Sequence, residues 1–205
     1  MNAKPQSSTP AHISASTSTL ALPPQLASFV KQLQALLATA PAEPVVLQQG
    51  GALLQQLITS DDWLAQDATH PHPDHYQQYL LYADPDERFS VVSFVWGPSQ
   101  GTPIHNHTVW GLIGMLRGAE ESQNYGQDAQ GCWLPEGAPH LLQSGDVQAV
   151  SPSIGDVHRV HNAVDGQVSI SIHVYGADIG KVQRQVFVAD GSSKLFVSGY
   201  ARRST

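Results

Sequence analysis

The chain has 205 residues, of which 41% are hydrophobic and 13% charged, a composition that excludes a disordered chain or a long coiled coil. The net charge of −7, with only 10 Lys and Arg residues, argues against a nucleic-acid partner. The single cysteine, Cys132, permits no intrachain disulfide, and no apolar run reaches the roughly 20 residues that a membrane-spanning helix needs.

Residues 1–22 are rich in Ser and Thr and contain no apolar stretch of the kind found in signal peptides. We expect a disordered leader there. Together with the missing membrane segment, this favours a soluble cytoplasmic protein.

Residues 23–75 are predicted to form a helical annex. Pro23-Pro24 suits the start of a helix, and apolar residues then recur at helical spacing until Pro41. A second helix is predicted over 45–58, although Gly50-Gly51 weakens its middle.

Two short features close the annex. Ser60 is a candidate cap for a short third helix. The prolines within 70–75 indicate a loop, and we interpret its histidines as solvated rather than metal-binding: His70, His72 and His75.

From residue 76 to residue 205, short β-like runs alternate with Gly, Pro, Asp and Asn. Strands are predicted over 76–82, 89–96, 109–116, 131–134, 146–150, 168–175, 186–188 and 195–197. A hairpin turn is predicted at Ala189-Asp190-Gly191-Ser192. Such spacing is typical of an all-β sandwich or barrel. We therefore predict a mainly β fold in which the barrel of residues 76–205 forms one structural domain with the annex.

The most informative motif is His105-Asn106-His107, shortly after the β-like run 89–96. Alternate side chains of a strand share a face, so the two imidazoles can hold one metal ion, with His158 as a third candidate. Taken alone, a His-x-His pair is usually a chance pair. Three histidines can also hold zinc and activate water, so the spacing does not decide the metal.

The histidines and their surroundings resemble the two motifs of the cupins, which are small double-stranded β-barrels. The first motif is His-x-His followed by Glu and then Gly, and the second includes Gly-x-x-His-x-x-x-Asn. The matching residues are His105, His107, Gly118, Gly155, His158 and Asn162. Gly111 stands where the cupin Glu is expected, which leaves three neutral histidines.

The segment 76–175 is similar to the thiol dioxygenases of the cysteine dioxygenase type I family, which use a three-histidine ferrous iron and lack the cupin Glu. The matching pieces are Tyr76-Gln77-Gln78, Pro103-Ile104-His105-Asn106-His107-Thr108, Leu116-Arg117-Gly118 and Ser171-Ile172-His173-Val174-Tyr175. The resemblance implies a cupin jelly roll and a Fe(2+) cofactor on His105, His107 and His158. It also implies oxidation of a thiol by O₂ to the sulfinate.

Two departures from the animal enzymes resemble the bacterial branch with 3-mercaptopropionate dioxygenase activity. Gln78 replaces the Arg that binds the substrate carboxylate in the animal Tyr-x-Arg motif, and Gly111 replaces the Cys that crosslinks to the active-site Tyr. The segment 109–114 also looks like that branch. The resemblance implies a preference for 3-mercaptopropionate over cysteine and no crosslink at Tyr175.

Ser171, His173 and Tyr175 share one face of a predicted strand. A bare Ser-x-His-x-Tyr is more often an ordinary half-exposed strand. The resemblance implies instead a relay in which Ser171 orients His173 and His173 bonds Tyr175, whose hydroxyl meets the substrate or bound oxygen.

Further candidates for substrate binding are Gln78 and Arg184. Gln78 aligns with the carboxylate-binding Arg of the animal enzymes. Arg184 follows Tyr175 by nine residues and either supplies the cation that Gln78 lacks or lies on the surface. His161 is interpreted as a neighbour of His158 or as an exposed residue.

The leading hypothesis is an iron(II) thiol dioxygenase whose partners are a small mercapto-acid and O₂. Two alternatives stay open. One is a non-enzymatic metal-binding cupin sensor, and the other is a zinc-dependent cupin hydrolase or isomerase.

Overall fold

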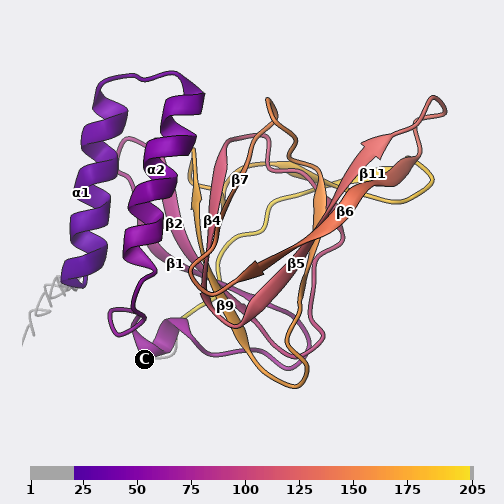
Figure 1. Cartoon of the computed structure of the whole chain (residues 1–205). Helices are drawn as coiled ribbons and strands as arrows, with labels where there is room; N and C mark the ends of the chain where they lie inside the picture. The colour runs from indigo at the N-terminus through magenta and orange to yellow at the C-terminus, as the bar shows by residue number, and fades with distance from the viewer. Residues whose placement is uncertain (1–20, 204–205) are drawn as a thin grey trace, which may run out of the picture.

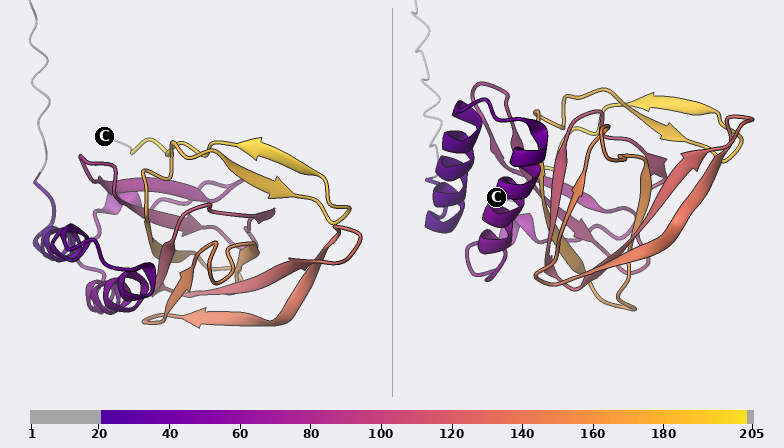
Figure 2. Two further views of the ribbon diagram at one scale, coloured as in Figure 1. Left: turned by 90° about the horizontal axis from the view of Figure 1, so that it is seen from above. Right: turned by 45° about the horizontal axis from the view of Figure 1, so that its top comes forward.

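The computed structural model describes residues 21–203, so nearly all of the leader predicted at 1–22 lies outside the described residues. Two antiparallel sheets enclose a barrel, and two helices lie side by side against one of them (Figures 1 and 2). In the described part of the chain, no helix is long and apolar enough to cross a membrane.

The two sheets are each built from strands far apart in the sequence. The five-stranded sheet has the order β1 (Gln77–Ala83), β2 (Ser90–Trp96), β9 (Ser169–Tyr175), β4 (Gly111–Arg117) and β7 (Val147–Val150). The six-stranded sheet has the order β11 (Ser193–Phe196), β10 (Arg184–Phe187), β3 (Ile104–His105), β8 (His158–Asn162), β5 (Ala119–Gln127) and β6 (Trp133–Gln143). The predicted fold class, a mainly β double-stranded barrel with an N-terminal helical annex, is confirmed.

The helices α1 (Pro24–Ala38) and α2 (Glu43–Leu57) each carry a proline in their first turn. Their apolar faces bury the outer side of the five-stranded sheet (Figure 1). Gly50, expected to weaken α2, lies where the helix approaches β4, and a Cβ there would come within 3.0 Å of Leu112. The glycine therefore permits close packing of helix and sheet.

The third helix predicted after Ser60 is wrong. The Ser60 hydroxyl donates to Asp62 instead of accepting a backbone N–H, and the Trp63 indole N–H donates to the carbonyls of Leu57 and Ser60 at 3.0 and 2.9 Å. These bonds fold the chain back onto the end of α2. Only the short 3₁₀ turn η1 (Gln66–Ala68) follows, and residues 70–75 form a loop, as predicted.

Seven of the predicted strands coincide with observed ones to within a few residues, and so does the hairpin turn that ends with Gly191 at φ +88°. The prediction missed β3, β5 and β8 and covered only the start of β6. The sequence of β5 is almost wholly polar, and the side chains it buries are Glu120 and Ser122. No alternation of apolar and polar residues marks such a strand.

Strand β9 is buried along its whole length. Ile170, Ile172 and Val174 belong to the core beneath the helices. Their neighbours in the strand point to the opposite face, into the barrel. The half-exposed strand considered for Ser171, His173 and Tyr175 is therefore wrong.

Candidate metal centre and its pocket

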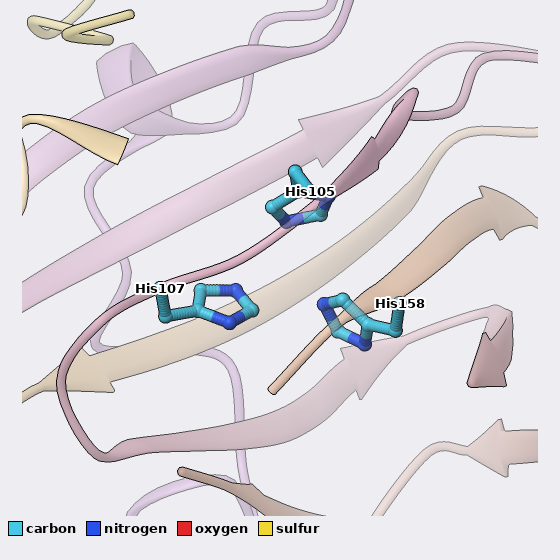
Figure 3. A group of neighbouring side chains, drawn as sticks. All are labelled: His105, His107 and His158. Atoms are coloured by element: carbon cyan, nitrogen blue, oxygen red, sulfur yellow. The ribbon is translucent and has the colours of Figure 1, made fainter. Parts of the chain in front are cut away.

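Three predicted metal ligands meet inside the barrel. His105 lies on β3 directly opposite His158 on β8, and His107 follows β3 by two residues. One ring nitrogen from each lies within 4.8 Å of the others, and all three side chains are buried. Figure 3 shows the rings pointing toward one another. Strand β3 ends at His105. The turn that follows β3, and not a continuation of the strand, therefore sets the direction of the His107 side chain.

A hydrogen bond at Nδ1 orients each imidazole. The Nδ1 atoms of His105 and His107 lie 3.1 and 3.2 Å from the carbonyl oxygens of Pro103 and Asp156. A carbonyl only accepts, so these Nδ1 atoms carry the proton and leave the Nε2 lone pairs free. Nδ1 of His158 lies 3.0 Å from the Ser122 hydroxyl. Such outer partners fix the direction of metal-binding histidines.

The histidines are neutral at pH 7. Burial lowers the pKa of His105 to about 4, and it lowers the pKa values of His107 and His158 well below the ordinary value. Three oriented, uncharged Nε2 atoms suit a divalent ion such as iron or zinc and leave its full charge in place. The residues present therefore fit the metal that the sequence implies.

The structure also brings the predicted relay together. Ser171 Oγ lies 2.8 Å from His173 Nε2, and His173 Nδ1 lies 2.8 Å from the Tyr175 hydroxyl. Burial lowers the pKa of His173 to about 3 and raises that of Tyr175. The Tyr175 ring stacks on His107 with a centroid distance of 5.4 Å. The relay thus ends beside His107, a predicted metal ligand, and both of its ionisable members, His173 and Tyr175, are neutral.

A cavity of about 260 Å³ opens onto the histidines and Tyr175, and both Gln78 and Arg184 line it. Arg184 is buried, so the surface alternative is wrong. Its Nη2 donates to Ser198 at 2.8 Å, and its guanidinium lies 4.7 Å from the Phe196 ring centroid. Arg184 Nε and Gln78 Oε1 have no hydrogen-bond partner among the described residues. Unpaired polar atoms at this depth point to a polar ligand.

The other histidines considered lie outside the centre. His161 is half-exposed, with Nε2 3.7 Å from Glu121. Within residues 21–203, the possible metal ligands that cluster are only those of the three-histidine centre, so the loop with His70, His72 and His75 forms no such group.

Sequence reasoning missed two residues that shape the centre, Ser122 and Asp156, and the buried Glu120 near Ser122. Ser122 and Glu120 lie on the unpredicted strand β5. The Asp156 carboxylate accepts the backbone N–H groups of His107 and Thr108 at 3.0 and 2.9 Å and so holds the turn after β3. The sequence signal for Asp156 was its place beside the Gly155 of the second motif.

We expect no thioether crosslink at Tyr175. Gly111 pairs with Tyr175 across β4 and β9, and a Cβ there would lie 3.0 Å from Tyr175 Cδ1, so a cysteine at this position would touch the ring. The cysteine present, Cys132, lies in the turn between β5 and β6. Intact-protein mass spectrometry should give the full mass of the chain, and a mass short by two hydrogens would contradict this.

Fold and site together define a double-stranded β-barrel protein with a buried three-histidine pocket. The chain matches no protein-family model. Among solved structures it resembles an uncharacterized conserved protein with a double-stranded β-helix domain from Klebsiella pneumoniae subsp. pneumoniae MGH 78578, at 16% identity over 64% of this chain and 86% of that one, with a TM-score of 0.43.

Two further similar structures are cupin 2 conserved barrel domain proteins. For the one from Rhodopseudomonas palustris, the identity is 17%, the coverage 60% of this chain and 76% of that one, and the TM-score 0.43. For the one from Salinispora arenicola CNS-205, the identity is 20%, the coverage 53% of this chain and 82% of that one, and the TM-score 0.40. At these identities and TM-scores, the likeness does not extend to activity or substrate.

Proposed function

We propose that the protein is an iron(II)-dependent thiol dioxygenase that adds both atoms of O₂ to the sulfur of a small mercapto-acid, with 3-mercaptopropionate as the favoured substrate. One observation carries the proposal. Three buried neutral histidines share a small cavity with the Tyr175 hydroxyl and with a buried Arg184. Among the described residues, no carboxylate forms an ion pair with that Arg.

His105, His107 and His158 would hold the iron through Nε2. Bound iron supplies the positive charge that favours a thiolate and the redox chemistry that O₂ requires. With only three protein ligands, the site would have room to hold both reactants close together.

The remaining polar groups suit a carboxylate. Arg184 would donate to the carboxylate of the mercapto-acid through its free N–H, and Gln78 and Tyr175 would add neutral hydrogen bonds. No Asp or Glu is among the described residues that line the cavity, so an ammonium group would find no charged partner. This favours a substrate without an amino group.

The apolar walls would keep water away from the reacting sulfur. Phe94, Trp96 and Val160 line the cavity, and Phe94 also stacks on His173 at a centroid distance of 3.9 Å. A dry wall strengthens the polar contacts of Arg184 and Tyr175 with a bound carboxylate.

Oxygen uptake by the iron-loaded protein tests the proposal with four thiols: 3-mercaptopropionate, cysteine, cysteamine and mercaptosuccinate. We expect the highest kcat/KM for 3-mercaptopropionate, a lower value for cysteine and a low value for cysteamine, which has no carboxylate for Arg184. A tenfold preference for cysteine, about 1.4 kcal/mol in the opposite direction, would refute the substrate and leave the dioxygenase assignment standing.

Metal analysis separates the zinc alternative. Protein purified without added metal is expected to contain iron and to take up oxygen with a thiol. Bound zinc, together with no oxygen uptake after iron loading, would favour a hydrolase or isomerase.

A further inference from the structure

Glu120 is a buried carboxyl group with no part in the site as described so far. It lies on β5, is 1% exposed, and forms no salt bridge with a described residue. Its Oε1 atom has no hydrogen-bond partner among the described residues. A buried, unpaired carboxylate is costly, so such a group calls for a role.

Glu120 lies behind the predicted relay. Its carboxyl interacts with the Ser171 hydroxyl and the Trp96 indole N–H. Trp96 Nε1 also donates to Ser171 Oγ at 3.1 Å. Ser171 therefore lies between the carboxyl group and His173. The hydrogen-bonded chain itself runs from Ser171 Oγ through His173 to the Tyr175 hydroxyl, and Glu120 adjoins it at Ser171.

The protonation state of Glu120 sets the direction of this chain. When Glu120 is ionised, it accepts the Ser171 proton. His173 then donates from Nε2 to Ser171, and Tyr175 donates to His173 Nδ1. When Glu120 is neutral, it donates to Ser171, whose own proton then turns to His173 Nε2. His173 donates from Nδ1 to the Tyr175 oxygen, and the Tyr175 proton faces the cavity.

We propose that Glu120 is the proton store of this site and takes up, through Ser171, His173 and Tyr175, the proton that a substrate thiol loses on binding. The inference rests on the proposed thiol oxidation, whose balance is RSH + O₂ → RSO₂⁻ + H⁺. One proton enters at Tyr175, each hydroxyl or imidazole passes one on, and Glu120 gains one. Every member but Glu120 ends with the proton count it began with.

The surroundings of Glu120 suit a group that changes its charge near neutral pH. Burial raises its pKa to about 7, and the two donors, Ser171 and Trp96, oppose this. Its partners across β6 and β8 are Leu142 and Asn162, which carry no charge. The titratable groups connected to Glu120 through Ser171 are His173 and Tyr175 of the relay. Glu120 in turn helps to raise the pKa of Tyr175.

The test compares Glu120→Gln and Glu120→Asp with a matched control, Glu121→Gln. Gln cannot exchange a proton, whereas Asp keeps the acid. Glu121 neighbours Glu120 on β5 but is half-exposed and near His161. Three quantities are measured for each variant: iron content, kcat and KM for 3-mercaptopropionate against pH, and the infrared absorption of protonated carboxyl groups in the metal-free protein.

In the wild type, kcat/KM should rise through pH 7 as Glu120 ionises and becomes able to accept a proton. Glu120→Gln should keep its iron and its KM, lose about tenfold in kcat, and lose this limb of the pH profile. Glu120→Asp should recover part of the lost kcat and part of the lost limb of the pH profile. Glu121→Gln should behave as wild type. Equal pH profiles in Glu120→Gln and Glu121→Gln would overturn the proposal.

The infrared measurement separates this inference from the proposed function. A carboxyl band that titrates near pH 7 should be present in the wild type and in Glu121→Gln, absent from Glu120→Gln, and shifted in Ser171→Ala. If this band behaves as expected while iron-loaded protein takes up no oxygen with any thiol, the thiol oxidation fails and the proton store stands. If no such band titrates, the proton store is wrong whatever the activity.

Discussion

Replacing His158 by Ala is expected to abolish both iron binding and thiol-dependent oxygen uptake. His158 is the member of the centre that comes from β8, opposite His105. Without it, two imidazoles from one short segment remain. Even the loss of an outer partner of a metal ligand costs about 10- to 100-fold in metal affinity, so the loss of a ligand should cost more than that. Metal analysis should fall from one iron per chain to none.

His161→Ala is the matched control for this prediction. His161 lies on the same strand but is half-exposed and points to Glu121. It should keep its iron and its activity. His158→Asn adds a check on folding because its amide keeps a polar group beside Ser122. If His158→Ala retained full oxygen uptake, the three-histidine assignment would be wrong.

The parts of the site that sequence reasoning found are those whose pattern is local. His105-x-His107 and Ser171-x-His173-x-Tyr175 each lie within a few residues, so their spacing made them candidates for one shared face, and the family resemblance selected them. The partner from β8 was found only through its motif and the family resemblance.

The features that the sequence did not predict depend on contacts that form only in the folded barrel. The side chains that β5 buries are polar because they meet buried polar groups, as Ser122 meets His158, and its pattern therefore lacks the apolar alternation of a strand. Arg184 read equally well as a surface residue, since nothing in its own segment shows that β10 folds over the pocket. Gly50 read as a weak point in a helix because its partner, Leu112, is distant in the sequence.

Arg184→Leu is expected to raise the KM for 3-mercaptopropionate by about 10- to 100-fold, with a smaller effect on kcat. A hydrogen bond to a charged group contributes about 1.5–3 kcal/mol, and each 1.4 kcal/mol is a factor of ten. The guanidinium is buried at the cavity wall with its Nε unpaired among the described residues. Loss of the buried cation therefore leaves the substrate carboxylate with the neutral donors Gln78 and Tyr175 and with Lys194, which lines the cavity from an exposed position. Arg184→Lys keeps the charge but loses the planar pair of donors of the guanidinium. Its KM for 3-mercaptopropionate should lie between those of the wild type and Arg184→Leu.

Cysteamine distinguishes carboxylate binding from a purely structural role of Arg184. Arg184 also contacts Ser198 and Phe196, so its removal can loosen the hairpin of β10 and β11. Cysteamine has no carboxylate, and its kcat/KM should be the same in Arg184→Leu and in wild type. Arg159→Leu, a change at an exposed position of β8, should affect neither thiol. Equal losses for both thiols in Arg184→Leu would show that Arg184 supports the hairpin and does not bind the carboxylate.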